Sequence, residues 1–204
     1  MVYSIENAFQ LIVLLVGSVT AIWYAVKKQK KVWLLLALFF GCWVFDDLYW
    51  LLIWIFYGST PSIGVLSDLC WYASYIFLYL LLIEAAPPEK SVKKSLWPWF
   101  GPLFTIAMAF FYMQWGDELN NLLYGIFIGL VMFAAIRRLT DGEYRKVRSL
   151  ALVTLIFCLL EYCMWTASCF FKEDTLVNPY YWFDFLLTVS FLLFLPAVRK
   201  AVAE

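Results

Sequence analysis

The sequence predicts an all-α polytopic membrane protein, with seven transmembrane helices forming a single domain over residues 1–204. Three observations lead to this prediction. Hydrophobic residues make up 65% of the chain and charged residues 15%, and the mean hydropathy is +0.81. The apolar residues fall into seven runs, each long enough to cross a hydrocarbon core of about 30 Å. The connections between the runs are too short to hold a soluble domain.

Polar or helix-breaking residues bound each of the seven runs. The runs cover approximately residues 7–26, 33–56, 63–84, 96–114, 119–136, 148–171 and 179–198. Lysines follow the first run, and Gly58 and Pro61 follow the second. Pro87 and Pro88 end the third run, because proline cannot continue the helical hydrogen bonds. The later runs are separated by an acidic turn, an arginine-rich segment and a polar loop that begins at Lys172.

The basic residues predict how the helices are oriented, because lysine and arginine gather in the cytoplasmic loops of membrane proteins. Fourteen of the fifteen basic residues lie in the first, third and fifth connections or after the last helix, and Lys172 alone lies on the other side. We therefore expect the N-terminus outside and the C-terminus in the cytoplasm. The expected location is the plasma membrane of a bacterium, with the lipid bilayer as the surrounding partner.

The composition argues against several classes of function. The net charge is zero, which does not favour binding to nucleic acid. Histidine, the commonest general base and the commonest transition-metal ligand, is absent. The five cysteines lack the spacing of a zinc site and are interpreted as small packing residues inside the helices. The sequence thus predicts no metal site and no cofactor.

Five acidic residues lie within the predicted helices, all in the half of the membrane expected to face outward: Asp46, Asp47, Asp68, Glu161 and Asp184. A charged side chain near the centre of a bilayer costs about 2.5–3.5 kcal/mol on insertion scales, so such residues usually have a function. No basic residue is placed to pair with them. They are either protonated, neutralised by a bound cation, or hydrogen bonded to side chains of neighbouring helices.

Aromatic residues accompany these acids at helical spacing. Trp43, Asp47, Trp50 and Trp54 are separated by four, three and four residues, which places them on one face of a helix. We therefore predict an outward-open cavity lined by the second, third, sixth and seventh helices. Its expected ligand-binding residues are Asp47, Trp50, Asp68, Trp71, Tyr75, Glu161, Trp165 and Asp184.

Purely structural roles are the alternative for each acid. Asp68 follows Ser67 near a helix start, where it could cap the helix. One of Asp46 and Asp47 could bond to a neighbouring helix, Asp184 could lie at the membrane surface, and Glu161 could serve packing alone.

The halves of the chain also suggest an internal repeat of three helices, one linking helix and three helices in parallel. Asp47 and Trp50 would correspond to Glu161 and Trp165. Asp68 and Trp71 would correspond to Asp184 and Trp182. Repeats of this kind place binding sites at the interface between the halves.

The series Asp47-x-x-Trp50, Gly58-x-x-Pro61-Ser62 and Asp68-x-x-Trp71-x-x-x-Tyr75 resembles the multi-helix membrane-sensing region at the N-terminus of bacterial diguanylate cyclases and sensor kinases. The resemblance covers approximately residues 41–84. It implies a module that receives a signal. The chain has no output domain after its helices, so we expect a stand-alone module, or one that acts through a membrane or cytoplasmic signalling partner.

A second, weaker resemblance rests on Phe45-Asp46-x-x-Tyr49 and Asp184, which is similar to the small seven-helix membrane terpene cyclases. It implies an intramembrane enzyme in which a protonated carboxylic acid, Asp46 or Asp47, opens an epoxide and aromatic faces stabilise the carbocation.

Taken together, these patterns favour a sensor- or receptor-like membrane protein that binds a small cationic, amine-bearing or proton-linked ligand from outside. The enzyme is the alternative, and a small solute transporter is a further one.

Overall fold

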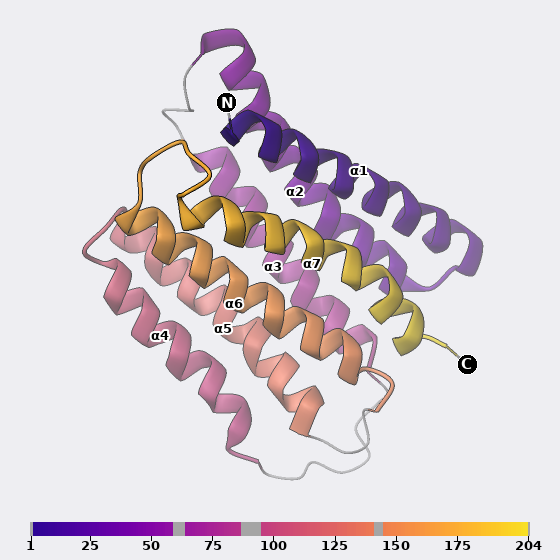
Figure 1. Cartoon of the computed structure of the whole chain (residues 1–204). Helices are drawn as coiled ribbons and strands as arrows, with labels where there is room; N and C mark the ends of the chain where they lie inside the picture. The colour runs from indigo at the N-terminus through magenta and orange to yellow at the C-terminus, as the bar shows by residue number, and fades with distance from the viewer. Residues whose placement is uncertain (1, 59–63, 87–94, 141–144, 204) are drawn as a thin grey trace.

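The computed structural model is helical throughout the part of the chain that it describes, residues 2–58, 64–86, 95–140 and 145–203 (Figure 1). No strand occurs among these residues. The helices are α1 (Val2–Lys28), α2 (Lys31–Tyr57), α3 (Val65–Glu84), the short 3₁₀ helix η1 (Trp97–Trp99), α4 (Phe100–Tyr112), α5 (Glu118–Thr140), α6 (Arg148–Phe170) and α7 (Pro179–Ala201).

Six of these helices are long and apolar enough to cross a membrane: α1, α2, α3, α5, α6 and α7. The chain is therefore an integral, multi-pass membrane protein. The run predicted at 96–114 forms η1 and α4, and α4 has only 13 residues, a length of roughly 20 Å. This is shorter than a hydrocarbon core, so a seventh crossing stays a prediction.

Local sequence explains where the helices begin and end. α2 ends at Gly58, which has a φ of 64° and donates its N–H to the Trp54 carbonyl. Glycine adopts this left-handed conformation without a steric penalty. α7 begins with Pro179 after Asn178, whose side chain accepts the Tyr180 N–H at 2.9 Å. This is a favoured start, because proline needs no N–H partner in the first turn and the asparagine caps the helix.

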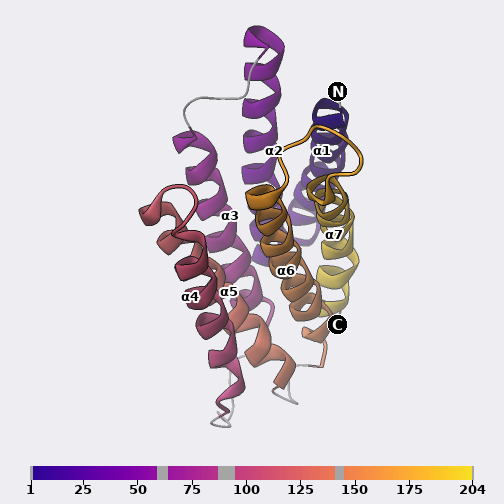
Figure 2. The same ribbon diagram turned by 60° about the vertical axis from the view of Figure 1, so that its left-hand side comes forward.

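The six long helices form a closed ring, with α4 outside it (Figure 2). Around the ring, the packed pairs are α1 with α2, α2 with α3, α3 with α5, α5 with α6, α6 with α7, and α7 with α1. α4 packs along α5. Most neighbours in the ring are helices that follow one another in the chain, and they are antiparallel. Two neighbouring pairs, α3 with α5 and α7 with α1, run parallel and have no direct connection (Figure 1). We call these two contacts the parallel seams.

Small residues allow α4 to approach α5 closely. A Cβ atom on Gly129 of α5 would lie 2.7 Å from Thr105 Oγ1, and one on Gly101 would lie 2.8 Å from Met132 Cβ. Both distances are shorter than any normal contact. Close packing on glycine is a common way for helices to associate in membranes, where no hydrophobic effect drives them together.

Aromatic rings fill the centre of the ring of helices. Phe39 of α2 lies 5.6 Å from Phe157 of α6 and 5.2 Å from Phe194 of α7, measured between ring centroids. Trp43, one turn further along α2, contacts Phe157 at 5.8 Å and Phe191 at 5.3 Å. These large side chains fill the middle of the bundle. Asp46 and Asp47 follow Trp43 along α2, and Glu161 lies one turn after Phe157 on α6.

Candidate functional site

Asp46 points from α2 toward α3 and accepts two hydrogen bonds there. The Ser67 hydroxyl donates to one carboxyl oxygen, and the Trp71 indole N–H donates to the other at 2.5 Å. Trp50 in turn donates to the Ser67 hydroxyl oxygen at 3.1 Å. Asp46 and Trp50 are four residues apart on α2, and Ser67 and Trp71 are four apart on α3, so each pair shares one helical face. Asp46 thus makes the interhelical contact considered as one alternative for the aspartate pair.

Asp47 points in another direction, because successive residues of a helix are about 100° apart. The side chain is 4% exposed, and its Oδ2 has no hydrogen-bond partner among the described residues. The carboxyl groups of Asp46 and Asp184 are close enough to interact with it electrostatically. Asp47 therefore lies in the interior of the ring, with a carboxyl oxygen available for a further interaction.

Asp184 of α7 forms a polar contact with α1 across one parallel seam. The Gln10 amide donates to Asp184 Oδ1 at 3.2 Å. The Glu6 carboxyl group also lies within hydrogen-bond reach of Asp184. No N–H or O–H group of the other described residues donates a hydrogen bond to either Glu6 carboxyl oxygen. Two carboxyl groups make such a contact when they share a proton. Asp184 is 5% exposed, so it is a buried group and not a residue of the membrane surface.

Glu161 of α6 is the most deeply buried acid, with no exposed surface. The hydroxyl group of Tyr75, which is also fully buried, is one of its polar neighbours. The two groups lie near each other, but neither makes a hydrogen bond of good geometry within the described part of the chain. A buried carboxyl group without a hydrogen-bond partner costs free energy.

Asp68 of α3 forms the matching contact at the other parallel seam. It accepts the Tyr124 hydroxyl at 3.0 Å and the Asn120 amide at 3.0 Å, both from α5. The helix begins earlier, with Gly64 as its N-cap, and Asp68 makes no capping contact with its side chain. The capping role considered for Asp68 is therefore wrong, because the helix starts one turn before it.

Trp71 connects the buried Asp46 to a cluster of aromatic rings. Its ring lies 5.8 Å from Trp43, 5.5 Å from Tyr124 and 6.1 Å from Trp165 between centroids. Tyr124 and Trp165 contact each other at 4.9 Å. Trp71 therefore binds a carboxyl group with its edge, and its faces are part of an aromatic cluster shared by α2, α3, α5 and α6.

This aromatic cluster forms one side of a cavity of about 320 Å³. Six aromatic side chains from α3, α5, α6 and the end of α4 line it: Trp71, Tyr112, Trp115, Tyr124, Tyr162 and Trp165. Asn121 and Lys172 also line the cavity. The Lys172 ammonium donates to the Ser168 carbonyl at the end of α6. The site is thus an aromatic cage with one ammonium group at its edge.

The structure places the predicted ligand-binding and catalytic residues in several different settings. Trp71 and Trp165 line the aromatic cavity. Asp46, Asp47, Glu161 and Asp184 are each at most 5% exposed, which places them in the interior and not on the wall of an open cavity. Trp50 reaches Asp46 through the Ser67 hydroxyl, and Tyr75 is itself a neighbour of Glu161. Asp68 lies at the α3–α5 seam.

Several residues of this region were missed in the sequence. Glu6 and Gln10 lie four apart on α1, a spacing that signals a polar face, but Glu6 precedes the expected start of the first run. Tyr112 and Tyr124 carry no acid beside them in sequence, so nothing local distinguishes them from tyrosines at a membrane interface. Tyr162 directly follows Glu161, and this adjacency was the signal that could have identified it.

No group of three or more histidine, cysteine, aspartate or glutamate side chains in the described ranges is arranged to hold a metal ion. Comparisons with protein-family models, with curated proteins and with solved structures give no significant match. The function is therefore argued from the geometry of the site.

Proposed function

We propose that this protein is a receptor-like membrane protein that binds a small organic cation, such as an amine or a quaternary ammonium compound, in the aromatic cavity. The observation that carries the proposal is the cage of six aromatic side chains around 320 Å³. Aromatic faces attract a cation by about 0.5–2 kcal/mol each, with the larger values in desolvated sites. A methylated ammonium group offers no strong hydrogen-bond donor, so an aromatic cage suits it better than a carboxylate does.

Two walls of the cage also donate hydrogen bonds to carboxyl groups. Trp71 donates to Asp46 and Tyr124 donates to Asp68. Hydrogen bonds of this kind polarise the donor, which increases electron density on its ring. The acids thus support the binding of a cation from behind the cage, without touching it. This differs from direct ion pairing with Asp47, Glu161 and Asp184, which the sequence favoured.

Lys172 restricts the kind of cation that fits. A ligand with two positive charges would be repelled by its ammonium group, whereas a ligand that carries a carboxylate beside its ammonium would be attracted. We therefore expect a monocation or a zwitterion of the betaine type.

The arrangement of the halves supports the proposed repeat. Asp68 of α3 accepts from Asn120 of α5, and Asp184 of α7 accepts from Gln10 of α1. In both cases the third helix of one half contacts the first helix of the other across a parallel seam. We propose a repeat of α1–α3 and α5–α7, linked by α4. The basic residues further support an orientation with the cavity on the outer side of a bacterial plasma membrane, where binding would be passed to a signalling partner.

Choline and its uncharged isostere 3,3-dimethylbutan-1-ol provide the test. Isothermal titration calorimetry of the purified protein in detergent should detect choline or glycine betaine, and binding of the neutral alcohol should be at least tenfold weaker. The Trp165→Leu variant should lose binding, whereas Trp182→Leu, an exposed position on α7, should retain it. Equal affinity for choline and the alcohol would refute the proposal.

The intramembrane enzyme is a second candidate, and one observation favours it. An apolar groove of about 420 Å³ lies between α1 and the beginning of α7, and Glu6, the carboxyl neighbour of Asp184, lines it. A proton shared by this pair could be donated to an apolar substrate, as could one on Asp46 or Asp47. This candidate predicts turnover that is lost in an Asp184→Asn variant. Solute movement in liposomes would instead favour a transporter.

A further inference from the structure

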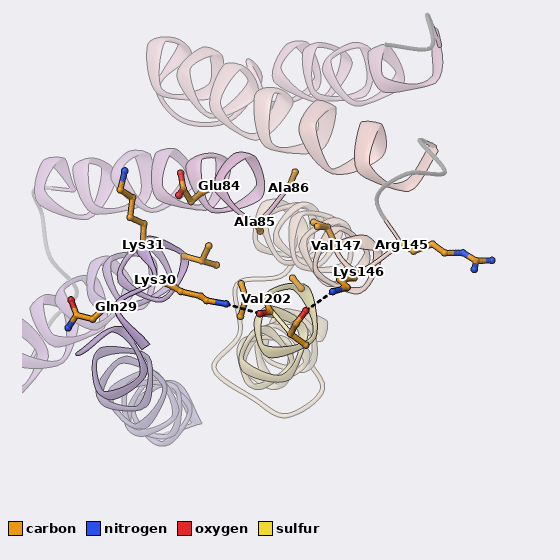
Figure 3. A pocket seen from close by; sticks show the side chains of 13 residues that line it. Gln29, Lys30, Lys31, Glu84, Ala85, Ala86, Arg145, Lys146, Val147 and Val202 are labelled. Carbon is orange, nitrogen blue, oxygen red and sulfur yellow. Dashed lines mark hydrogen bonds between the residues drawn. The ribbon is translucent and has the colours of Figure 1, made fainter. Parts of the chain in front are cut away.

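Basic side chains surround a second, larger cavity at the opposite end of the bundle, the end expected to face the cytoplasm (Figure 3). The α1–α2 turn, the end of α3, the start of α6 and the end of α7 enclose about 740 Å³. Lys30, Lys31, Arg145 and Lys146 line it, together with one acid, Glu84. This volume lies within the range of about 300–1,000 Å³ that is typical of small-molecule sites.

Two of the lysines are held in place by the end of α7. Lys30 donates to the Val202 carbonyl at 3.1 Å and Lys146 donates to the Ala203 carbonyl at 2.7 Å. Figure 3 shows them reaching this point from opposite sides. An ammonium group has three donors, so the bond from Lys146 to Ala203 still allows it to bind a ligand. Ordering the side chains in advance lowers the entropic cost of binding.

A neighbouring cavity of about 530 Å³ extends the same positive surface. It shares Lys30, Val202 and Ala203 with the first cavity and adds Lys27, Lys28 and Arg199. The lining residues of the two cavities thus include seven different basic side chains: Lys27, Lys28, Lys30, Lys31, Arg145, Lys146 and Arg199.

Among the described residues that line the two cavities, Glu84 is the only acid. The carboxyl end of the α7 dipole adds about half a negative charge. The tendency of basic residues to gather in cytoplasmic loops explains why this end is positive, but it does not require Lys30 and Lys146 to meet at the end of α7 beside a cavity. The Arg145 guanidinium points away from these two lysines (Figure 3). Lysines that line a cavity are typical of sites that bind phosphate groups.

We propose that this basic cavity binds a phosphate-bearing anion. The ligand is either a free phosphorylated compound or the headgroup of an anionic phospholipid, because both present the same oxygens. The site is independent of the aromatic cavity, so either proposal can fail without the other.

The experiment uses the whole chain and two sources of phosphate. The first arm titrates inorganic pyrophosphate into protein in a nonionic detergent and measures binding by calorimetry. The second arm places the protein in nanodiscs of equal phosphatidylcholine and phosphatidylglycerol, releases it, and counts retained phosphatidylglycerol by native mass spectrometry. Both arms compare wild type with the Lys31→Gln/Lys146→Gln double variant.

The control is the Arg148→Gln/Lys200→Gln double variant. It removes the same charge, and neither residue lines the basic cavity. Each lost charge-assisted contact should weaken binding about tenfold, so the first variant should bind about a hundredfold more weakly and the control should bind like wild type.

Pyrophosphate binding that follows this pattern supports a free phosphorylated ligand. Retention of phosphatidylglycerol with the same pattern, in the absence of pyrophosphate binding, supports a lipid headgroup. The proposal is overturned if neither anion binds, or if the control variant weakens binding as much as the double lysine variant does. Circular dichroism of each variant distinguishes lost binding from lost folding, and an unfolded double variant is replaced by the two single variants.

Discussion

Replacing Trp71 by phenylalanine tests the hydrogen bond that connects the aromatic cage to the buried acids. The change keeps an aromatic ring but removes the indole N–H that donates to Asp46 at 2.5 Å. A hydrogen bond to a charged group contributes about 1.5–3 kcal/mol, and one between neutral groups about 0.5–1.5 kcal/mol. The loss of unfolding free energy therefore also reports whether Asp46 is ionised.

Trp43 provides a matched control for this experiment. It is a neighbour of Trp71 in the same cluster, is only 2% exposed, and its indole N–H has no hydrogen-bond partner among the described residues. Trp43→Phe therefore removes ring area and an unpaired donor, without removing a hydrogen bond. Because Trp71 is less buried than Trp43, packing alone predicts that Trp43→Phe is the more damaging change.

The hydrogen bond predicts the opposite order. Unfolding of each variant by sodium dodecyl sulfate in mixed micelles gives its free energy of unfolding. We expect Trp71→Phe to be more destabilising than Trp43→Phe by about 1.5–3 kcal/mol if Asp46 is charged. If Trp71→Phe is no more destabilising than Trp43→Phe, the link between Asp46 and the aromatic cage does not contribute to stability and this reasoning is wrong.

Two further predictions concern the helix contacts. Gly129→Ala should destabilise the protein by about 1–3 kcal/mol, because the added Cβ would lie 2.7 Å from Thr105 Oγ1. Gly41→Ala is the control and should be neutral or stabilising, because its added Cβ would have nothing within 4 Å. Unfolding of both variants in detergent measures the difference in stability. The contact between Glu6 and Asp184 needs a shared proton, so its contribution to stability should be lost as the pH rises. Glu6→Gln supplies a permanent donor and should make stability less dependent on pH in thermal melts, whereas Glu118→Gln, at an exposed position, should leave the wild-type dependence unchanged.

Hydrophobic runs were sufficient to locate the helices, because exclusion of water from the bilayer forces every long apolar segment to form one. The second run was expected at 33–56 and α2 spans Lys31–Tyr57. The fourth run was the exception. Its apolar residues extend over 96–114, but Pro98 and Pro102 shape its start, and its α-helical part begins only at Phe100. Composition cannot distinguish such a short helix, packed on glycine, from a full crossing.

The candidate site was harder to predict, because it depends on which helices are neighbours. The sequence identified Asp46 and Asp47 as unusual, but adjacent residues point in different directions and the sequence does not say which one meets α3. Tyr124 was missed for the same reason. Its importance comes from contacts with two residues that are distant in sequence. Asp68 lies 56 residues before it, and Trp165 lies about 40 residues after it.

The two parallel seams differ from the other contacts of the ring in what holds the helices in register. All other contacts in the ring join helices that are consecutive in the chain. At the seams the two helices are not consecutive, so the contacts between them fix the position of α3 along α5 and of α7 along α1. Asp68 and Tyr72 at one seam, and Asp184 at the other, make the polar contacts that set the axial register at these two places. Any displacement of one half against the other must break or exchange the hydrogen bonds of these two aspartates, which makes them the elements to observe if the protein changes shape.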